Sequence, residues 1–255
     1  MRIAFTAADT PRAQEARARL VARYGDTPLN RAEVLVCLGG DGFMLDTLRF
    51  IMGRQLPVYG LNYGTVGFLM NQPKESDGDA LEKRLLGAQP TIIAPLHMKA
   101  ITTDGNTLEG MGFNDVFLYR QTRQAIHVRI EIDGRVRMED LTADGVIVAT
   151  PAGSTAYNRS VQGPILPLGS NLLSLAPICP FHPRHWRGAL LPEGAEVRFV
   201  LKETWKRPAS AVAGATEVRD VAEATIKVAH KDQVQLLFDP DHELSERIIA
   251  EQFAA

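Results

Sequence analysis

The sequence has little of what marks secreted or membrane-spanning proteins. Its 255 residues include only two cysteines, Cys37 and Cys179, and no Cys-x-x-Cys pair. No apolar run approaches the roughly 18 residues that are needed to cross a bilayer. The N-terminus, Met1–Phe5, enters a strand-like pattern without a signal peptide's apolar core. We therefore expect a soluble cytoplasmic protein in which Cys37 is a reduced core thiol.

An excess of basic residues is also missing. The 28 Lys and Arg residues are balanced by 30 Asp and Glu residues, for a formal net charge of −2. This balance argues against binding to nucleic-acid phosphates or to an anionic membrane, but it permits a nucleotide-binding enzyme. Hydrophobic residues make up 45% of the chain, which is enough to fill one large domain or two modest ones.

The first third of the chain alternates between short strands and helices. The expected strands and helices are Arg2–Thr6, Pro11–Tyr24 (helix), Glu33–Leu38, Phe43–Met52 (helix) and Leu56–Leu61. This alternation predicts a parallel sheet, in which ligands bind near the carboxyl ends of the strands. Two polar or glycine-rich segments, Gly39–Gly42 and Asn62–Leu69, fall at such ends.

After Pro90 the pattern changes to strands and hairpins. Asp104-Gly105 and Asp133-Gly134 are typical two-residue hairpin turns. Further expected elements are strands at Gly145–Thr150, Glu196–Leu201, Ala224–Ala229 and Val234–Phe238, and helices at Asn171–Leu175 and Glu243–Phe253. The predicted fold is therefore α/β plus all-β. It has a Rossmann-like parallel-sheet domain at 1–92, a β-rich sandwich domain at 93–238, and a C-terminal helix at 239–255 that packs back on the first domain.

An aspartate stands among three glycines in the run Gly39-Gly40-Asp41-Gly42. The run matches neither Gly-x-x-x-x-Gly-Lys-Ser/Thr nor Gly-x-Gly-x-x-Gly. Glycines at a strand end let main-chain N–H groups approach phosphate, and the N-terminus of the following helix adds positive potential. Because an aspartate repels phosphate, Asp41 is expected to accept a proton from a hydroxyl or to hold a metal ion. The competing interpretation is that Asp41 caps a helix starting at Phe43.

Two further segments carry candidate ligand-binding groups. Asn114-Asp115 places an amide beside a carboxylate, which suits the edges of a base or a ribose, although an Asx turn also explains the pair. Asp144–Pro164 opens from a strand into small and hydroxyl-bearing residues with one tyrosine, Tyr157, whose ring offers a flat face for a base or sugar. Its length favours ligand binding over a plain turn. His182 and His185 have no nearby third ligand, so a structural or surface role is favoured over metal binding.

Together these segments resemble the NAD kinases. Gly39–Gly42, Asn62–Leu69, Asn114-Asp115 and Thr150–Tyr157 occur in that family in this order and at these spacings, over nearly the whole chain. The first run alone is shared with lipid kinases and phosphofructokinase-like enzymes. The resemblance implies ATP-dependent phosphorylation of the 2′-hydroxyl of the adenosine ribose of NAD, giving NADP, with Mg²⁺ accompanying ATP. It also implies a homodimer or homotetramer whose partner subunit completes the site.

The resemblance assigns roles to individual residues. Asp41 is the general base, Gly39, Gly40 and Gly42 hold phosphate groups, and no side chain is assigned as a metal ligand. The residues implied to contact NAD are Asp41, Gly42, Asn114, Asp115, Thr142, Asp144, Ala152, Thr155, Ala156, Tyr157, Asn158, Arg159, Ser160, Cys179 and Ala215.

Three positions depart from the family pattern. Phe43 stands where threonine is common, and Asp115 stands where glutamate is usual, so its carboxylate reaches about one methylene less far. Ala213–Ala215 replaces a segment in which many relatives carry an aspartate, so a carboxylate contact to the ligand is absent. The last departure lends weight to one alternative, a nucleotide sensor that binds NAD without catalysis. The other alternative is a lipid kinase, which is expected to lack the loop around Thr155–Tyr157.

Overall fold

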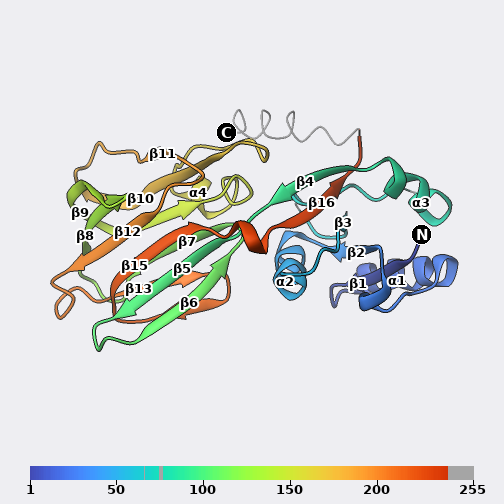
Figure 1. Cartoon of the computed structure of the whole chain (residues 1–255), viewed down its shortest axis with the longest axis horizontal. Coiled ribbons are helices and arrows are strands. Elements are labelled where there is room, and N and C mark those ends of the chain that lie inside the picture. The colour runs from blue at the N-terminus through green and yellow to red at the C-terminus, as the bar shows by residue number, and fades with distance from the viewer. Residues whose placement is uncertain (66, 75–76, 241–255) are drawn as a thin grey trace. The chain divides into compact units, whose positions relative to one another are not determined.

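The structure is a computed structural model that describes residues 1–65, 67–74 and 77–240 (Figure 1). The chain divides into two compact units, one formed by Met1–Ile93 with the segment that begins at Lys231, and one formed by Ala94–His230. Of the expected C-terminal helix at 239–255, all but Asp239 and Pro240 lies outside the described residues, as does Val66 within Asn62–Leu69.

The first unit is built on a five-stranded sheet with the strand order β1-β2-β3-β16-β4. Strands β1, β2 and β3 are parallel, and β16 runs parallel to β3 but antiparallel to β4. The expected parallel sheet is therefore confirmed. Its elements are β1 (Ile3–Ala7), α1 (Pro11–Tyr24), the 3₁₀ turn η1 (Leu29–Arg31), β2 (Val34–Gly39), α2 (Asp41–Ile51), β3 (Val58–Asn62), α3 (Asp77–Gly87), β4 (Gln89–Ile93) and β16 (Val234–Phe238).

Strand β2 is buried along its whole length because helices cover both faces of the sheet. Val36 and Leu38 pack in one cluster with α1 and α3. Cys37 points to the other face, where its Sγ lies 3.5 Å from Oγ1 of Thr47 on α2. Cys37 is fully buried, which confirms its expected place in the core, and burial raises the pKa of its thiol to about 12.

The helix starts follow local capping chemistry. Helix α1 has proline at its first position, and the Thr10 side chain accepts a hydrogen bond from Ala13 N at 3.4 Å. Helix α2 begins at Asp41, two residues before the expected start, and its N-cap is Gly40. No helix within the described residues is long and apolar enough to cross a membrane.

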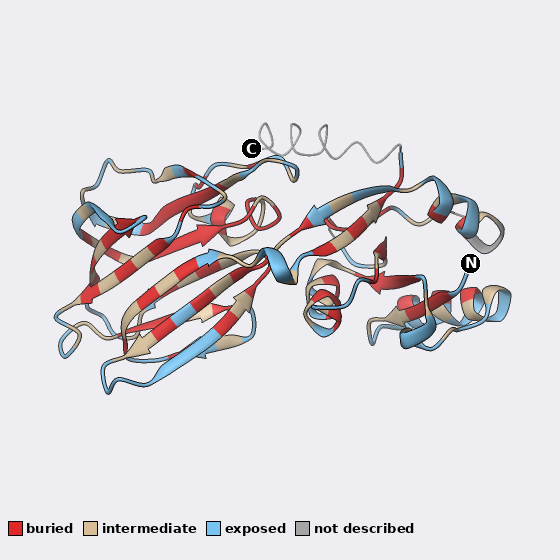
Figure 2. Ribbon diagram, in the orientation of Figure 1, coloured by how far each residue is buried: buried red, intermediate tan, exposed pale blue. Residues whose placement is uncertain are grey.

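The second unit is β-rich, as predicted, with its strands arranged in the order β14-β13-β7-β9-β8-β12-β15-β5-β6, while β10 pairs with β9 and β11. Buried residues alternate with partly exposed ones along β12, and the buried ones join one apolar core (Figure 2). Its elements are β5 (Leu96–Thr102), β6 (Thr107–Gly112), β7 (Asp115–Arg120), β8 (Ile126–Ile132), β9 (Arg135–Ala149), α4 (Tyr157–Ser160), β10 (Leu172–His182), β11 (Ala189–Pro192), β12 (Val197–Lys202), β13 (Ala209–Ala213), β14 (Thr216–Val218) and β15 (Val221–Val228), with the 3₁₀ turn η2 (His230–Asp232) after β15.

Two expectations about element type and placement were wrong. The segment expected to be a helix, Asn171–Leu175, enters strand β10, because β9 and β11 lie on either side of it and supply ladder hydrogen bonds. Strand Val234–Phe238 was expected in the second domain, but it completes the sheet of the first unit between β3 and β4 (Figure 1). Both outcomes depend on pairing partners that are distant in the sequence.

The two expected hairpins form, but with different loops. Asp133-Gly134 is a two-residue turn between paired Ile132 and Arg135, with positive φ angles of 52° and 72°. In the other hairpin, Thr102 N bonds to Asn106 O at 2.9 Å, so the loop contains Thr103, Asp104 and Gly105. The expected two-residue turn at Asp104-Gly105 is therefore a three-residue loop.

Candidate functional site

The carboxyl ends of β2 and β3 carry two loops that touch through glycine. Tyr63 N donates to Gly39 O at 2.8 Å. A Cβ atom added to Gly64 would lie 2.9 Å from Gly40 Cα, so a side chain at Gly64 would force the loops apart. Gly64 N also donates to Asn62 Oδ1 at 3.0 Å. Main-chain atoms of both glycine-containing loops are thus brought together at the edge where parallel sheets bind ligands.

Asp41 is held at this edge by main-chain groups from the β3 loop. Its Oδ2 accepts a hydrogen bond from Phe68 N at 2.8 Å, and its Oδ1 accepts one from Leu69 N at 2.9 Å. Because Gly40 is the N-cap and α2 has no side-chain cap, the interpretation of Asp41 as a helix cap is wrong. Each carboxylate oxygen has a second lone pair with which it can accept another hydrogen bond.

The residues beside Asp41 have different surroundings. Gly42 is exposed, and a Cβ there would meet no atom within 4 Å. The Phe43 ring lies against Gly39, where a Cβ would approach Phe43 Cδ1 to 2.8 Å. Phe43 therefore explains why glycine is needed at Gly39, while Gly42 leaves the first turn of α2 open to a ligand.

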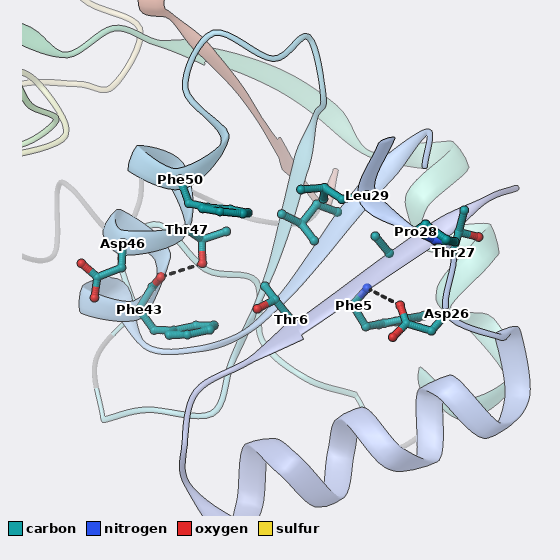
Figure 3. Close-up of a pocket in the computed structure, with 12 residues that line it drawn as sticks. Phe5, Thr6, Asp26, Thr27, Pro28, Leu29, Phe43, Asp46, Thr47 and Phe50 are labelled. Atoms are coloured by element: carbon teal, nitrogen blue, oxygen red, sulfur yellow. Dashed lines mark hydrogen bonds between the residues drawn. The ribbon is translucent and has the colours of Figure 1, made fainter. Parts of the chain in front are cut away.

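A cavity of about 580 Å³ lies beside α2 in the first unit. Figure 3 shows Phe43 and Phe50 of α2 on one side of it and Leu29 on the other, with Phe5 N bonded to Asp26 Oδ1 at 3.1 Å. No residue implied to contact NAD or phosphate is among the twelve residues that line it. We therefore do not assign this cavity to the predicted site.

In the second unit, strand register places several predicted residues at one end of the sheet. Asp115 at the start of β7 pairs with Ala149 at the end of β9, and the neighbouring Val116 pairs with Ala213, next to the turn that holds Ala215. By contrast, Thr142 lies seven residues back along β9 from Ala149, roughly 23 Å away at about 3.3 Å per residue. The structure does not bring Thr142 into this group.

The loop after β9 is fastened to Asn114 by internal hydrogen bonds. Thr150 donates from N to Asn114 O at 2.9 Å and from Oγ1 to Phe113 O at 2.6 Å. A Cβ on Gly153 would lie 2.0 Å from Asn114 O, so this approach requires glycine. Asn114 Oδ1 is buried and has no hydrogen-bond partner among the described residues, which leaves one acceptor available to a ligand.

Some polar residues of the loop serve the loop itself. Ser154 is fully buried, and its Oγ bonds to Pro151 O at 2.7 Å and to Leu166 N at 2.9 Å. Asn158 is also fully buried, and its Oδ1 accepts from Ser174 Oγ at 2.8 Å. These two side chains shape the loop. Ala152 is buried as well, whereas Thr155, Ala156, Tyr157 and Arg159 are partly exposed and Ser160 is exposed.

Tyr157 is the centre of a cluster of ionisable groups. Partial burial raises the pKa of its hydroxyl, and the nearby Tyr119, Cys179, Asp115 and Asp144 raise it further. Burial also raises the pKa of Asp115 to about 6. The structure therefore brings four predicted residues, Asp115, Asp144, Tyr157 and Cys179, into electrostatic range of one another.

Sequence reasoning missed two partners of this cluster. Phe117 meets the Tyr157 ring edge-on, and Arg120 Nε lies 2.7 Å from Asp144 Oδ1. Phe117 points to the same face of β7 as Tyr119, which period-two alternation from Asp115 would have indicated. A cavity of about 430 Å³ opens beside them, lined by Phe117, Tyr119, Arg120, Gln121, Tyr157, Ser210, Val212, Glu217 and Arg219.

The described residues contain no group of three or more His, Cys, Asp or Glu side chains arranged to hold a metal ion. Mg²⁺ commonly binds through substrate phosphates and retained waters with only one or two carboxylates.

The first unit is a parallel-sheet α/β unit with an amide-held carboxylate, Asp41, at a glycine-rich strand end. It is joined in the chain to a β-rich unit in which ionisable groups surround Tyr157. Models of the ATP-NAD kinase N-terminal domain and C-terminal domain match residues 12–87 and 113–236, respectively. The chain belongs to the NAD kinase family, and the resemblance and the kinase activity predicted from the sequence are confirmed at that level.

Curated relatives agree with this assignment, and solved structures share the fold. An NAD kinase from Xylella fastidiosa (strain 9a5c) is 52% identical over 253 residues, covering 99% of this chain and 96% of the relative. An NAD kinase from Caulobacter vibrioides is 50% identical over 254 residues, covering 100% and 96%. Yeast NADH kinase, solved with NADH, shares the fold with a TM-score of 0.85 at 22% identity, covering 100% of this chain and 88% of that chain. An NAD kinase from Archaeoglobus fulgidus, solved with ATP, has a TM-score of 0.77 at 22% identity, covering 98% of each chain.

Proposed function

We propose that Asp41 is the general base that takes the proton from the 2′-hydroxyl of the adenosine ribose of NAD while the γ-phosphoryl group of ATP is transferred to that oxygen. The observation that carries the proposal is the pair of hydrogen bonds from Phe68 N and Leu69 N, which fix the carboxylate at the N-terminus of α2. A fixed carboxylate beside the reacting hydroxyl can take its proton late in a loose transition state. Main-chain groups of Gly39, Gly40 and Gly42 are assigned to the phosphates.

The second unit is assigned to holding NAD. Asn114 has a buried acceptor without a partner, Asp115 lies beside it, and Tyr157 offers a ring braced by Phe117. An amide oxygen and an aromatic face suit the amino group and ring of an adenine. The remaining assigned contacts of this unit are Asp144, Ala152, Thr155, Ala156, Arg159, Ser160, Cys179 and Ala215. Thr142 lies apart from this group and the buried Asn158 side chain serves the loop, so neither is assigned.

Three further features of the proposal concern the setting of the reaction. Mg²⁺ bound with ATP would supply positive charge beside the transferred phosphoryl group. The protein acts as a homodimer or homotetramer, supported by the exposed Phe181 and Cys179 near the small apolar cluster that contains Ile178.

The free cysteines fit a reducing compartment, so we place the enzyme in the cytoplasm.

Substitution of Asp41 tests the general base. Asp41→Asn and Asp41→Ala are expected to lower kcat by about 10²-fold or more, with the Kd for NAD changed by less than about threefold. Asp46→Asn is the matched control, because Asp46 is an exposed carboxylate on the same helix. A kcat within tenfold of the parent for both Asp41 variants would show that Asp41 is not the base.

The same assay separates the enzyme from a nucleotide sensor. The parent protein is incubated with NAD, ATP and Mg²⁺, and NADP is quantified enzymatically over time. Steady accumulation of NADP is expected. Binding of NAD by calorimetry without any NADP would favour the sensor.

A further inference from the structure

The loop that holds Asp41 is itself anchored by a buried asparagine. Asn71 is fully buried, and its main chain bonds to two residues of β3. Asn71 N donates to Gly60 O at 2.9 Å, and Asn62 N donates to Asn71 O at 2.8 Å. Phe68 and Leu69, the donors to Asp41, lie only three and two residues before it, respectively. The position of Asn71 therefore limits where these two N–H groups can point.

The Asn71 side chain joins β3 to β16. Its Nδ2 donates to Gly60 O at 3.1 Å and to Leu237 O at 3.0 Å, and its Oδ1 accepts from Asp239 N at 2.9 Å. Both donor hydrogens and the acceptor of the amide are thus used across two strands. No other uncharged side chain of similar size offers two donors and an acceptor in this geometry.

Asp239 continues the network through a buried ion pair. Its Oδ2 lies 2.5 Å from an Arg84 guanidinium nitrogen, and its Oδ1 accepts from Tyr59 Oη at 2.7 Å. The side chains of Arg84 and Asp239 are only 9% and 7% exposed. Arg84 also donates to Gln72 O at 2.9 Å, so the residue after Asn71 is fixed as well.

We propose that Asn71 and the buried Arg84–Asp239 pair are positioning residues, which hold the 67–72 segment so that Phe68 N and Leu69 N lock the Asp41 carboxylate for catalysis. This inference rests on the proposed role of Asp41. Loss of the anchor leaves the substrate-binding groups in place but lets the carboxylate move. The expected signature is a fall in kcat with little change in the KM for NAD.

Kinetics of Asn71→Ala tests the inference against a general loss of stability. We expect kcat to fall by about tenfold to a hundredfold, because small misplacements of a catalytic group are costly. Leu20→Ala is the control, since Leu20 is a buried residue of α1 without a hydrogen-bonded side chain. Measured below the unfolding temperature of both variants, Leu20→Ala is expected to keep kcat within twofold. An equal fall in both variants would overturn the inference.

A double-mutant cycle asks whether Asn71 acts through Asp41. In an Asp41→Ala background, Asn71→Ala is expected to lower the residual kcat by less than threefold, because the group it positions is gone. Equal fold-changes in both backgrounds would overturn the positioning role while leaving the proposed base intact. A near-normal kcat for Asp41→Ala alone would instead reject the proposed base.

Hydrogen exchange supplies a readout that does not depend on activity. Amide exchange of the peptide covering 67–72 is expected to speed up in Asn71→Ala and to stay at the parent rate in Leu20→Ala. If Asn71→Ala fails to fold, Tyr59→Phe removes one hydrogen bond to Asp239 with little change of shape. For Tyr59→Phe we expect faster exchange of the same peptide and a several-fold lower kcat. Unchanged exchange and kcat in that variant would overturn the inference.

Discussion

The ring of Tyr157 stands edge-on to the ring of Phe117, with centroids 5.1 Å apart and planes at 78° to one another. Phe117 comes from β7 and Tyr157 from the first position of α4, so the contact sets the angle at which the loop after β9 presents its tyrosine. Edge-to-face pairs contribute about 0.5–1.5 kcal/mol beyond the burial of their surface. Phe117 therefore supports the proposed NAD-binding ring without being one of the predicted contacts.

Removal of the Phe117 ring is expected to weaken NAD binding. In Phe117→Ala the Kd for NAD should rise by about threefold to tenfold, because the Tyr157 ring loses its edge partner. The maximal rate at saturating NAD should stay within about twofold. Titration calorimetry with NAD measures the change, and Trp205→Ala is the control, since Trp205 is 85% exposed. An unchanged Kd in Phe117→Ala would show that the contact between Phe117 and Tyr157 does not contribute to NAD binding.

Replacement of Gly153 is expected to separate the loop after β9 from Asn114. The new Cβ of Gly153→Ala would lie 2.0 Å from Asn114 O, in a contact that only a main-chain shift can relieve. We expect the free energy of unfolding to fall by about 3 kcal/mol or more and NAD binding to be lost.

Gly169→Ala is the matched control for that substitution. A Cβ at Gly169 meets no atom within 4 Å, and Gly169 is exposed. Its unfolding free energy should stay within about 0.5 kcal/mol of the parent. Urea unfolding followed by tryptophan fluorescence is suitable, because both tryptophans, Trp186 and Trp205, lie in the second unit. Equal stability of the two alanine variants would contradict the close approach at Gly153.

Local signals predicted the parts of the fold whose physics is local. The Thr10 cap and the following proline marked the start of α1, and Asp133-Gly134 marked a tight hairpin. Alternation of strands and helices predicted the parallel sheet of the first unit. The apolar segment around Leu173 suited a helix or a strand equally well, and only its pairing with β9 and β11 makes it a strand.

The candidate site was predictable where it depends on side-chain chemistry and not where it depends on the main chain. Asp41, Asn114 and Tyr157 were recognised from their residue types and spacing. The donors to Asp41 are the N–H groups of Phe68 and Leu69, which every residue except proline possesses, so no side chain marks them. The return of β16 beside Asn71 could not be predicted from the sequence either, because it depends on contacts between residues that are 166 positions apart.

The raised pKa of Asp115 makes the stability of the second unit depend on pH. Burial raises this pKa from 3.8 to about 6, so between these values the folded protein binds more protons than the unfolded chain. Asp115 therefore contributes favourably to the free energy of unfolding below pH 3.8. This contribution is lost as the pH rises through 6, and above that value the folded protein holds a buried charge. Between pH 5 and pH 7.5 this change amounts to about 1 kcal/mol.

Asp115→Asn is expected to remove this dependence, since an amide of the same shape does not titrate. The unfolding free energy of the variant minus that of the parent should be about 1 kcal/mol larger at pH 7.5 than at pH 5. Urea unfolding monitored by tryptophan fluorescence at both pH values gives the difference. Asp220→Asn serves as the control because Asp220 is exposed and asparagine tolerates its positive φ of 52°. The same stability difference between Asp115→Asn and the parent at both pH values would show that the folded carboxyl titrates as it does in the unfolded chain.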